Sequence, residues 1–157
     1  MNKKVLAFDF GAASGRAMLA EFDNVNRKIS MTEIHRFPNI PVVQNNTMYW
    51  DVLRLLSEMK QGILLAQKHG KIDAIGIDTW GVDFGMLDKD GQLIANPVHY
   101  RDRRTEGMPE EIYENIISQD DIYAKTGTQS LRINTLYQLY YLYKYKKNIM
   151  NCVDKIL

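Results

Sequence analysis

Two short apolar runs in this 157-residue chain each end in an aspartate, and a loop of small residues follows the first run. The first run is VLAF at residues 5–8, which leads through Asp9 and Phe10 to the segment GAASGR at residues 11–16. An acid at the carboxyl end of a buried strand lies where open α/β sheets hold their ligands. Small residues leave backbone N–H groups accessible to an anion, and Arg16 adds a fixed positive charge. This pattern favours a phosphate-binding loop between two strands.

The same segment also fits a tight hairpin with an acid nearby by chance. Gly11 and Gly15 can adopt positive φ, which would allow the loop to form an anion-binding nest. Two familiar phosphate-binding patterns, GxxxxGK followed by Ser or Thr and GxGxxG, are absent from the sequence. The surrounding elements must therefore decide between the two interpretations.

The second apolar run, IDAIGID at residues 72–78, predicts a short buried strand that ends in Asp78. Trp80 and Gly81 follow closely. A glycine there permits close approach of a ligand to the backbone, whereas Trp80 suits either an apolar wall for a ligand or simple core packing.

A dense charged segment, YRDRRT at residues 100–105, combines Tyr100 with three arginines and an aspartate. A solvated loop whose charges pair with each other is one interpretation. The alternative is a loop that lies over the same sheet edge as Asp78.

Hydrophobic periodicity places the elements around these segments. Strands are predicted at residues 5–8, 17–22 and 28–37, and they form three consecutive antiparallel strands. The segment at residues 38–48 is expected to be a loop because Pro38 and Pro41 end the third strand. Asp51 is the predicted N-cap of a helix that Gly70 ends. The apolar stripe of this helix is expected at Val52, Leu56, Met59, Ile63 and Ala66.

Beyond residue 81, strands are predicted at residues 82–88 and 92–94, with a turn between them. A helix is predicted from Pro109 to Ile117, followed by a short helical or turn segment that ends at Gly127. Asn134 is expected to cap the last helix. Its apolar face, which we expect to lie in the core or at an interface, comprises Leu136, Leu139, Tyr140 and Tyr143.

Composition indicates a globular chain, with 45% apolar residues and a net charge of +1. This balance gives no support to nucleic-acid or membrane binding, and no stretch approaches the ~18 apolar residues of a membrane span. A single cysteine, Cys152, fits a reducing, cytoplasmic setting. The three histidines are isolated in sequence, so we expect no zinc site and place His35, His69 and His99 at the surface or partly buried.

The predicted order of elements, three antiparallel strands, a helix and a strand ending in aspartate, is similar to the ribonuclease H-like fold of actin-like ATPases and sugar kinases. FDFGAASGR resembles the adenosine phosphate loop of the FGGY carbohydrate kinases, and GIDTWGVDFGMLD resembles the segment after their fourth core strand. YRDRRT resembles their sugar-side loop. The resemblance extends over the whole chain and includes EIHRF at residues 33–37 and NTLYQL at residues 134–139. It implies an α/β fold, with a mixed sheet of three antiparallel strands followed by helix–strand units.

The resemblance also implies roles for particular residues. Asp9 would face Mg²⁺, through water, and the sugar would contact Gly81, with Trp80 and Tyr100 as walls. The ATP-binding residues would be Ala12, Ala13, Ser14, Gly15 and Arg16. Within the family, the Trp80–Gly81 pair is similar to that of the branch that phosphorylates L-rhamnulose on its 1-hydroxyl with ATP. The open alternatives are a kinase for another sugar, such as fuculose or xylulose, and a non-catalytic actin-like module that binds nucleotide or sugar.

Kinases of this family are much longer than 157 residues. Residues 1–157 would form an incomplete amino-terminal domain, without the second actin-like domain that closes the nucleotide cleft. The family's general base would lie beyond Leu157, so no residue of this chain is assigned that role. We therefore expect the isolated chain to be inactive and to self-associate through exposed apolar surface.

Overall fold

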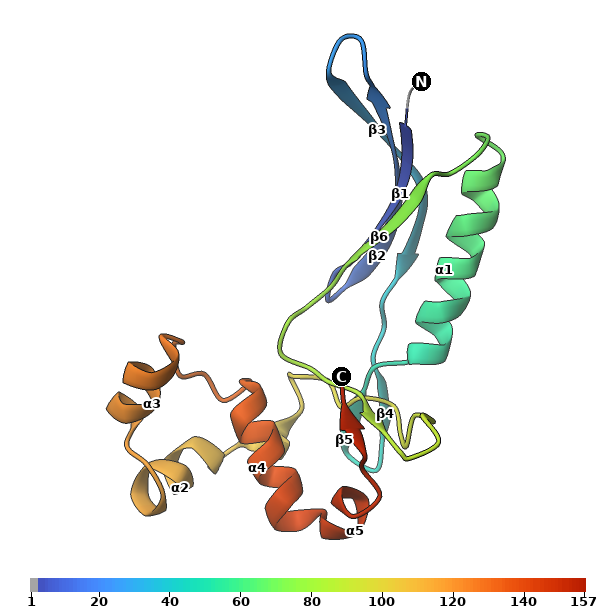
Figure 1. The fold of residues 1–157 in the computed structure, drawn as a ribbon. Helices are drawn as coiled ribbons and strands as arrows, with labels where there is room; N and C mark the ends of the chain where they lie inside the picture. Colours follow the sequence, from blue (N-terminus) through green and yellow to red (C-terminus); the bar gives the residue numbers. More distant parts are fainter. Residues whose placement is uncertain (1–2) are drawn as a thin grey trace. The chain divides into compact units, whose positions relative to one another are not determined.

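A computed structural model describes residues 3–157, which divide into two compact units (Figure 1). The first unit contains the described residues up to Ile40 together with Asp51–Gly81. The second contains Pro41–Trp50 and Val82–Leu157. Each unit has a core of its own, and the predicted phosphate loop lies in the first.

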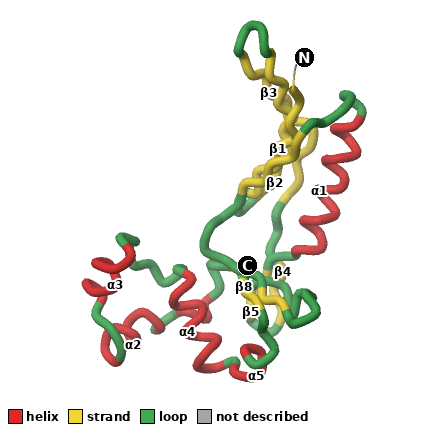
Figure 2. Tube along the Cα trace, in the orientation of Figure 1, coloured by secondary structure: helices red, strands yellow, loops and turns green. Residues whose placement is uncertain are grey.

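Unit 1 is a four-stranded mixed sheet with one helix (Figure 2). Its elements are β1 (Lys3–Phe10), β2 (Ser14–Asp23), β3 (Lys28–Pro38), α1 (Val52–Gln67) and β6 (Ala74–Asp78). The strand order is β3-β2-β1-β6, in which β1 and β2 pair antiparallel, as do β2 and β3, while β6 runs parallel to β1. The three antiparallel strands, the helix and the following strand are confirmed, and so is the mixed α/β class.

Alternation along the strands builds the core of this unit. Leu6, Phe8 and Phe10 of β1 are buried, and the intervening residues are more exposed, as expected for a sheet with one covered face. Helix α1 packs on the covered face. An added Cβ at Gly62 of α1 would lie 2.7 Å from a ring carbon of Phe8, so the glycine permits the close approach of helix and sheet.

The ends of α1 follow the predicted signals. Asp51 occupies the N-cap, and its Oδ1 accepts a hydrogen bond of 3.1 Å from the N–H of Arg54. Gly70, just after the helix, has φ of +101°, a conformation that favours glycine.

Two predictions for unit 1 were wrong in detail. The buried stripe of α1 runs through Leu55, not Leu56, which is 46% exposed; both positions are apolar, so periodicity alone did not distinguish them. Strand β6 was predicted to be buried, but all five of its residues are exposed. It is the edge strand of the described sheet, and Ile75 and Ile77 are more than half exposed there.

Unit 2 combines small β-pairs with helices. Its elements are β4 (Val42–Gln44), β5 (Thr47–Tyr49), β7 (Met86–Leu87), the 3₁₀ helix η1 (Arg103–Thr105), α2 (Met108–Asn115), α3 (Gln119–Thr126), α4 (Thr135–Tyr145), α5 (Lys147–Met150) and β8 (Lys155–Ile156). Strand β4 pairs with β5, and β7 pairs with β8. Met108, Ile112, Ile122 and Tyr137 form the core under the helices.

The predictions for unit 2 were less accurate. The expected loop at residues 38–48 contains the β4–β5 hairpin, whose two-residue turn, Asn45 and Asn46, has positive φ at both positions. The strand predicted at residues 82–88 is reduced to Met86–Leu87, and the one at residues 92–94 to a single bridge between Leu87 and Leu93.

The last helix is present, but a different face of it is buried. Tyr137 and Leu142 are inside, whereas Leu136 is 44% and Tyr143 68% exposed. Asn134 occupies the N-cap position without a capping hydrogen bond from its side chain. The expected apolar face instead lines an open groove within unit 2, together with residues of α2.

Candidate functional site

The predicted phosphate-binding residues gather at one edge of the sheet in unit 1. Asp9 lies near the end of β1 and pairs in register with Arg16 of β2 on one side and with Asp78 of β6 on the other. Residues in register project from the same face of a sheet. The segment at residues 11–13 joins β1 to β2 at this edge.

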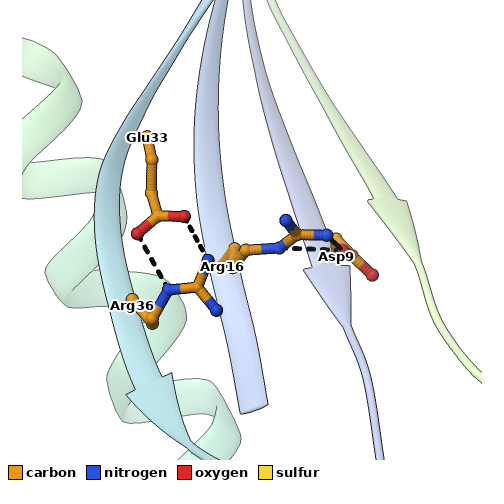
Figure 3. Close-up of polar contacts among 4 residues, drawn as sticks. All are labelled: Asp9, Arg16, Glu33 and Arg36. Carbon is orange, nitrogen blue, oxygen red and sulfur yellow. Dashed lines mark hydrogen bonds and ion pairs between the residues drawn. The ribbon is translucent and has the colours of Figure 1, made fainter.

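Arg16 and Asp9 form an ion pair across the two strands (Figure 3). The Nε of Arg16 donates to Oδ2 of Asp9 at 3.1 Å, and Nη2 of Arg16 donates to the same oxygen. The two side chains are 41% and 40% exposed, so incoming groups can reach both. The cation predicted to meet phosphate and the carboxylate predicted to face Mg²⁺ are therefore bonded to each other in this structure.

A second ion pair lies beside the first, on β3 (Figure 3). Arg36 donates from Nε to Oε1 of Glu33 at 2.9 Å and from Nη2 to Oε2 at 2.6 Å. The hydrogen bond from Arg36 is the largest cause that lowers the pKa of Glu33, and Arg16 contributes a smaller electrostatic effect in the same direction. The sequence analysis did not assign Glu33 and Arg36 to the site.

The loop itself differs from the predicted nest. Neither Gly11 nor Gly15 has positive φ, so the loop does not use the left-handed conformation that these glycines permit. The N–H of Gly11 donates to the carbonyl of Ser14 at 3.0 Å. Gly15 is required for packing, because an added Cβ would lie 2.1 Å from Cζ of Phe37.

The chain offers a partial donor set for Mg²⁺. Within residues 3–157 no group of three or more His, Cys, Asp or Glu side chains is arranged to hold a metal ion. Mg²⁺ commonly keeps several waters and uses one or two carboxylates together with substrate phosphates. Asp9, with Asp78 beside it in register, fits that requirement. Sequence inspection noted Asp78 at a strand end but gave it no role.

The predicted sugar-binding residues fall in both units. In unit 1, Trp80 is partly buried and packs against the core formed by residues such as Phe8, so core packing accounts for much of its environment. Gly81 is exposed, and an added Cβ there would meet no atom within 4 Å. The described residues therefore leave the space beside Gly81 open.

In unit 2, Tyr100 belongs to an aromatic cluster held by Asp83. The ring of His99 stacks on Trp50 with centroids 3.9 Å apart and lies 4.6 Å from the ring of Tyr100. Oδ2 of Asp83 accepts from Nε1 of Trp50 at 2.5 Å and from the N–H of Tyr100 at 3.1 Å. Nε2 of Gln138 donates to Oδ1 of Asp83 at 3.1 Å. This network fixes the backbone at Tyr100.

The charged segment after Tyr100 is only partly a solvated loop. Arg101 and Arg103 are exposed, but Asp102 is buried and accepts hydrogen bonds from the N–H groups of Met48 and Arg104. The guanidinium of Arg104 donates to Oε1 of Gln138 at 2.6 Å, and burial lowers its pKa. The segment is thus anchored to the rest of unit 2 through Asp102 and Arg104.

His99 is more deeply buried than expected, at 2% exposed, and burial is the main cause that lowers its pKa. Asp83 and Asp102 act in the opposite direction, and Arg101 acts with burial. Folding therefore favours the neutral ring. The stability that this contributes is complete above the unfolded-state pKa of about 6.5 and is lost as the pH falls below it.

We expect the free energy of unfolding to decrease between about pH 7.5 and pH 5.5, the range in which the unfolded-state histidine becomes protonated. Urea denaturation at both pH values measures this decrease. Substitution of the ring in His99→Gln should reduce the pH dependence, whereas His69→Gln, at an exposed site, should retain it. Equal pH dependence in all three proteins would contradict a role for His99.

A family model described as the FGGY family of carbohydrate kinases, N-terminal domain, matches residues 4–157. The chain belongs to this family. It is 44% identical over 136 residues to a rhamnulokinase from Mannheimia succiniciproducens, which covers 86% of this chain and 28% of that protein. It is 39% identical over 158 aligned positions to a rhamnulokinase from Bacteroides thetaiotaomicron, covering 100% of this chain and 32% of that one. The chain thus spans about a third of the length of these relatives.

Solved structures of this family share the fold. A gluconate kinase from Lactobacillus acidophilus aligns with a TM-score of 0.80 at 16% identity, over 100% of this chain and 31% of that one. A glycerol kinase from Plasmodium falciparum with ADP aligns with a TM-score of 0.70 at 18% identity, over 95% and 30%. Within the described part of the chain, no helix has the length and apolar character needed to span a bilayer.

Proposed function

We propose that residues 1–157 are the amino-terminal part of an ATP-dependent kinase that phosphorylates the 1-hydroxyl of L-rhamnulose. The identity of 39 to 44% to two rhamnulokinases is the observation that carries the choice of sugar. Some of the similar solved structures are named as kinases of gluconate or xylulose, but at 11 to 19% identity these structures bear only on the fold.

The site in unit 1 supports the nucleotide half of this proposal. Phosphoryl transfer needs cations around the phosphates and a carboxylate near the metal, and it asks little covalent chemistry of the protein. The small residues of the 11–16 segment admit the phosphates, with Arg16 as the cation beside them. Bound Mg²⁺ would neutralise phosphate charge, and Asp9 would hold it through water. The general base is expected from the part of the protein outside residues 1–157.

If Mg²⁺ and ATP bind as proposed, Asp9 and Arg16 no longer pair with each other. Each side chain is bonded to the other in the structure, and each would instead meet a ligand of opposite charge. Because the pair is about 40% exposed, breaking it costs little, about 0 to 1 kcal/mol for exposed pairs. The ion pair therefore keeps both groups near the loop without a large barrier to nucleotide binding.

For the sugar, we assign contact to the backbone at Gly81, with Trp80 beside it in unit 1 as an apolar wall. Gly81→Val in the whole protein should lower the affinity for L-rhamnulose about tenfold or more, since branched side chains would fill space that the ligand needs. An added Cβ meets no protein atom within 4 Å, so the fold should tolerate the change. Calorimetry with sugar and with ADP measures the two affinities separately. The control is Gly91→Val, which lies in a turn of unit 2 where the glycine has positive φ. It reports the effect of backbone strain alone. Equal loss of both ligands at Gly81→Val would contradict the assignment.

A kinase assay on the whole protein tests the proposed function. ADP release should depend on L-rhamnulose and should be faster than with L-fuculose or xylulose at equal concentration. Preference for another ketose would replace the substrate but keep the enzyme class. Binding of ADP without turnover of any sugar would favour the non-catalytic module. Sedimentation of residues 1–157 alone tests the separate prediction of self-association.

A further inference from the structure

Asn39 is a buried polar residue that contacts the phosphate loop from outside it. It follows directly after β3, within unit 1, and is 6% exposed. Its side chain Nδ2 donates to the carbonyl of Gly11 at 2.8 Å, and its backbone N–H donates to the carbonyl of Ala13 at 3.0 Å. One residue thus holds two carbonyls of a loop that is only three residues long.

These two hydrogen bonds determine the direction of neighbouring N–H groups. A trans peptide is planar, with its C=O and N–H pointing in opposite directions. The carbonyl of Gly11 shares a peptide with the N–H of Ala12, and the carbonyl of Ala13 shares one with the N–H of Ser14. Because Asn39 donates to both carbonyls, these carbonyls point toward it. The N–H groups of Ala12 and Ser14, at the other side of the same peptides, therefore point away from it.

One of the two N–H groups that Asn39 orients is available to a ligand: that of Ala12 donates to no acceptor among residues 3–157. The neighbouring N–H of Ala13, which Asn39 does not orient, also has no acceptor there. A loop with unpaired N–H groups oriented in advance binds an anion more tightly than a mobile loop, because the ordering cost is already met by the fold. The sheet edge beside them carries Arg16, which supplies the charge.

We propose that Asn39 is a positioning residue for the nucleotide phosphates: it directs the carbonyls of Gly11 and Ala13 away from the ligand and their partner N–H groups toward it. This inference rests on the proposed ATP-binding role of the loop. Asn39 itself does not contact the nucleotide. Its hydrogen bonds explain how the loop is oriented although none of its glycines has positive φ.

The test uses Asn39→Ala and Asn39→Asp in the whole protein. The alanine removes the side-chain hydrogen bond but keeps the one from the backbone N–H. The aspartate keeps the shape of the side chain but places an acceptor and a negative charge against the carbonyl of Gly11, so it should have the larger effect on ADP binding. KM for the sugar shows whether either variant disturbs the fold instead. Asn26→Ala is the matched control, because Nδ2 of Asn26 donates to Asp23 at 2.7 Å in the exposed β2–β3 turn of the same unit.

Calorimetry with ADP and Mg²⁺, together with KM for ATP and for sugar, supplies the readouts. We expect Asn39→Ala to weaken ADP binding and raise KM for ATP roughly 3- to 10-fold, the worth of one hydrogen bond, with KM for the sugar unchanged. Asn26→Ala should change neither. A merely structural role for Asn39 would weaken both ligands together or lower only the melting temperature.

The experiment distinguishes a failure of the positioning role of Asn39 from a failure of the proposed kinase function. If the parent protein binds ADP and phosphorylates the sugar while both Asn39 variants bind ADP as the parent does, the positioning role is overturned and the kinase function stands. If the parent protein does not bind ADP, both proposals are overturned together.

Discussion

Asp9→Asn in the whole protein is expected to lower kcat about 10²-fold or more, while the affinity for ATP stays within about fivefold of the parent value. A carboxylate near the metal matters most as charge develops in the transition state, whereas ground-state binding depends mainly on groups around the phosphates. Release of Arg16 from its ion pair with Asp9 also favours phosphate binding in the variant. Steady-state kinetics at saturating ATP and Mg²⁺, with calorimetry for ADP, measure the two quantities separately.

The structure makes this experiment interpretable. The Asp9–Arg16 pair is about 40% exposed on both sides, so its loss should affect the free energy of unfolding little. Asp73→Asn is the matched control, since Asp73 pairs with Lys3 and accepts from the N–H of Lys4 at the opposite end of β1. A kcat near the parent value for Asp9→Asn would show that Asp9 serves only as the partner of Arg16.

The first unit was predictable because its signals are local and repeat along the chain. The apolar run in β1, the N-cap at Asp51 and the helix end at Gly70 each agree with the structure. Where two apolar neighbours compete, as at Leu55 and Leu56, periodicity alone does not decide which one packs on the sheet. In the structure Gly62 and Ala66 lie against the sheet, and Leu55 is on the same face of α1.

The second unit was less predictable because its β-pairs are only two or three residues long. A pair of two residues, such as Met86–Leu87, has no repeat to detect, and its partner at Lys155–Ile156 is far away in the sequence. The β4–β5 hairpin did carry a signal. Two consecutive asparagines are typical of a turn with positive φ at both central positions, but the nearby prolines favoured a loop.

The residues of the candidate site also differ in how well the sequence predicts them. The residues with strand-end or loop positions, Asp9 and Arg16, were predicted from residue type and spacing. The contributions of Asn39 and Asp83 depend on contacts between segments distant in the sequence, and Arg36 reaches the site only because the β2–β3 register places it beside Arg16. Their roles follow from tertiary hydrogen bonds, so the sequence alone gave no reason to select them.

Gly15→Ala should destabilise unit 1 by about 1 to 3 kcal/mol, as overpacking of a core does. The added Cβ would lie 2.1 Å from Cζ and 2.4 Å from Cε2 of Phe37. Phe37 is 3% exposed and packs against Phe10 and His35, so its ring has little room to move. Urea denaturation of the whole protein measures the effect. Gly76→Ala in β6 is the matched control, because a Cβ there meets nothing within 4 Å, and it should leave stability nearly unchanged.

A double mutant decides whether this clash is the reason for a glycine at position 15. Phe37→Leu removes the ring atoms that the new Cβ would meet, at a cost of its own from lost packing. If the clash dominates, Gly15→Ala should cost less in the Phe37→Leu background, with a coupling of about 1 kcal/mol or more. Costs that add within about 0.5 kcal/mol would show that Phe37 does not exclude a side chain there.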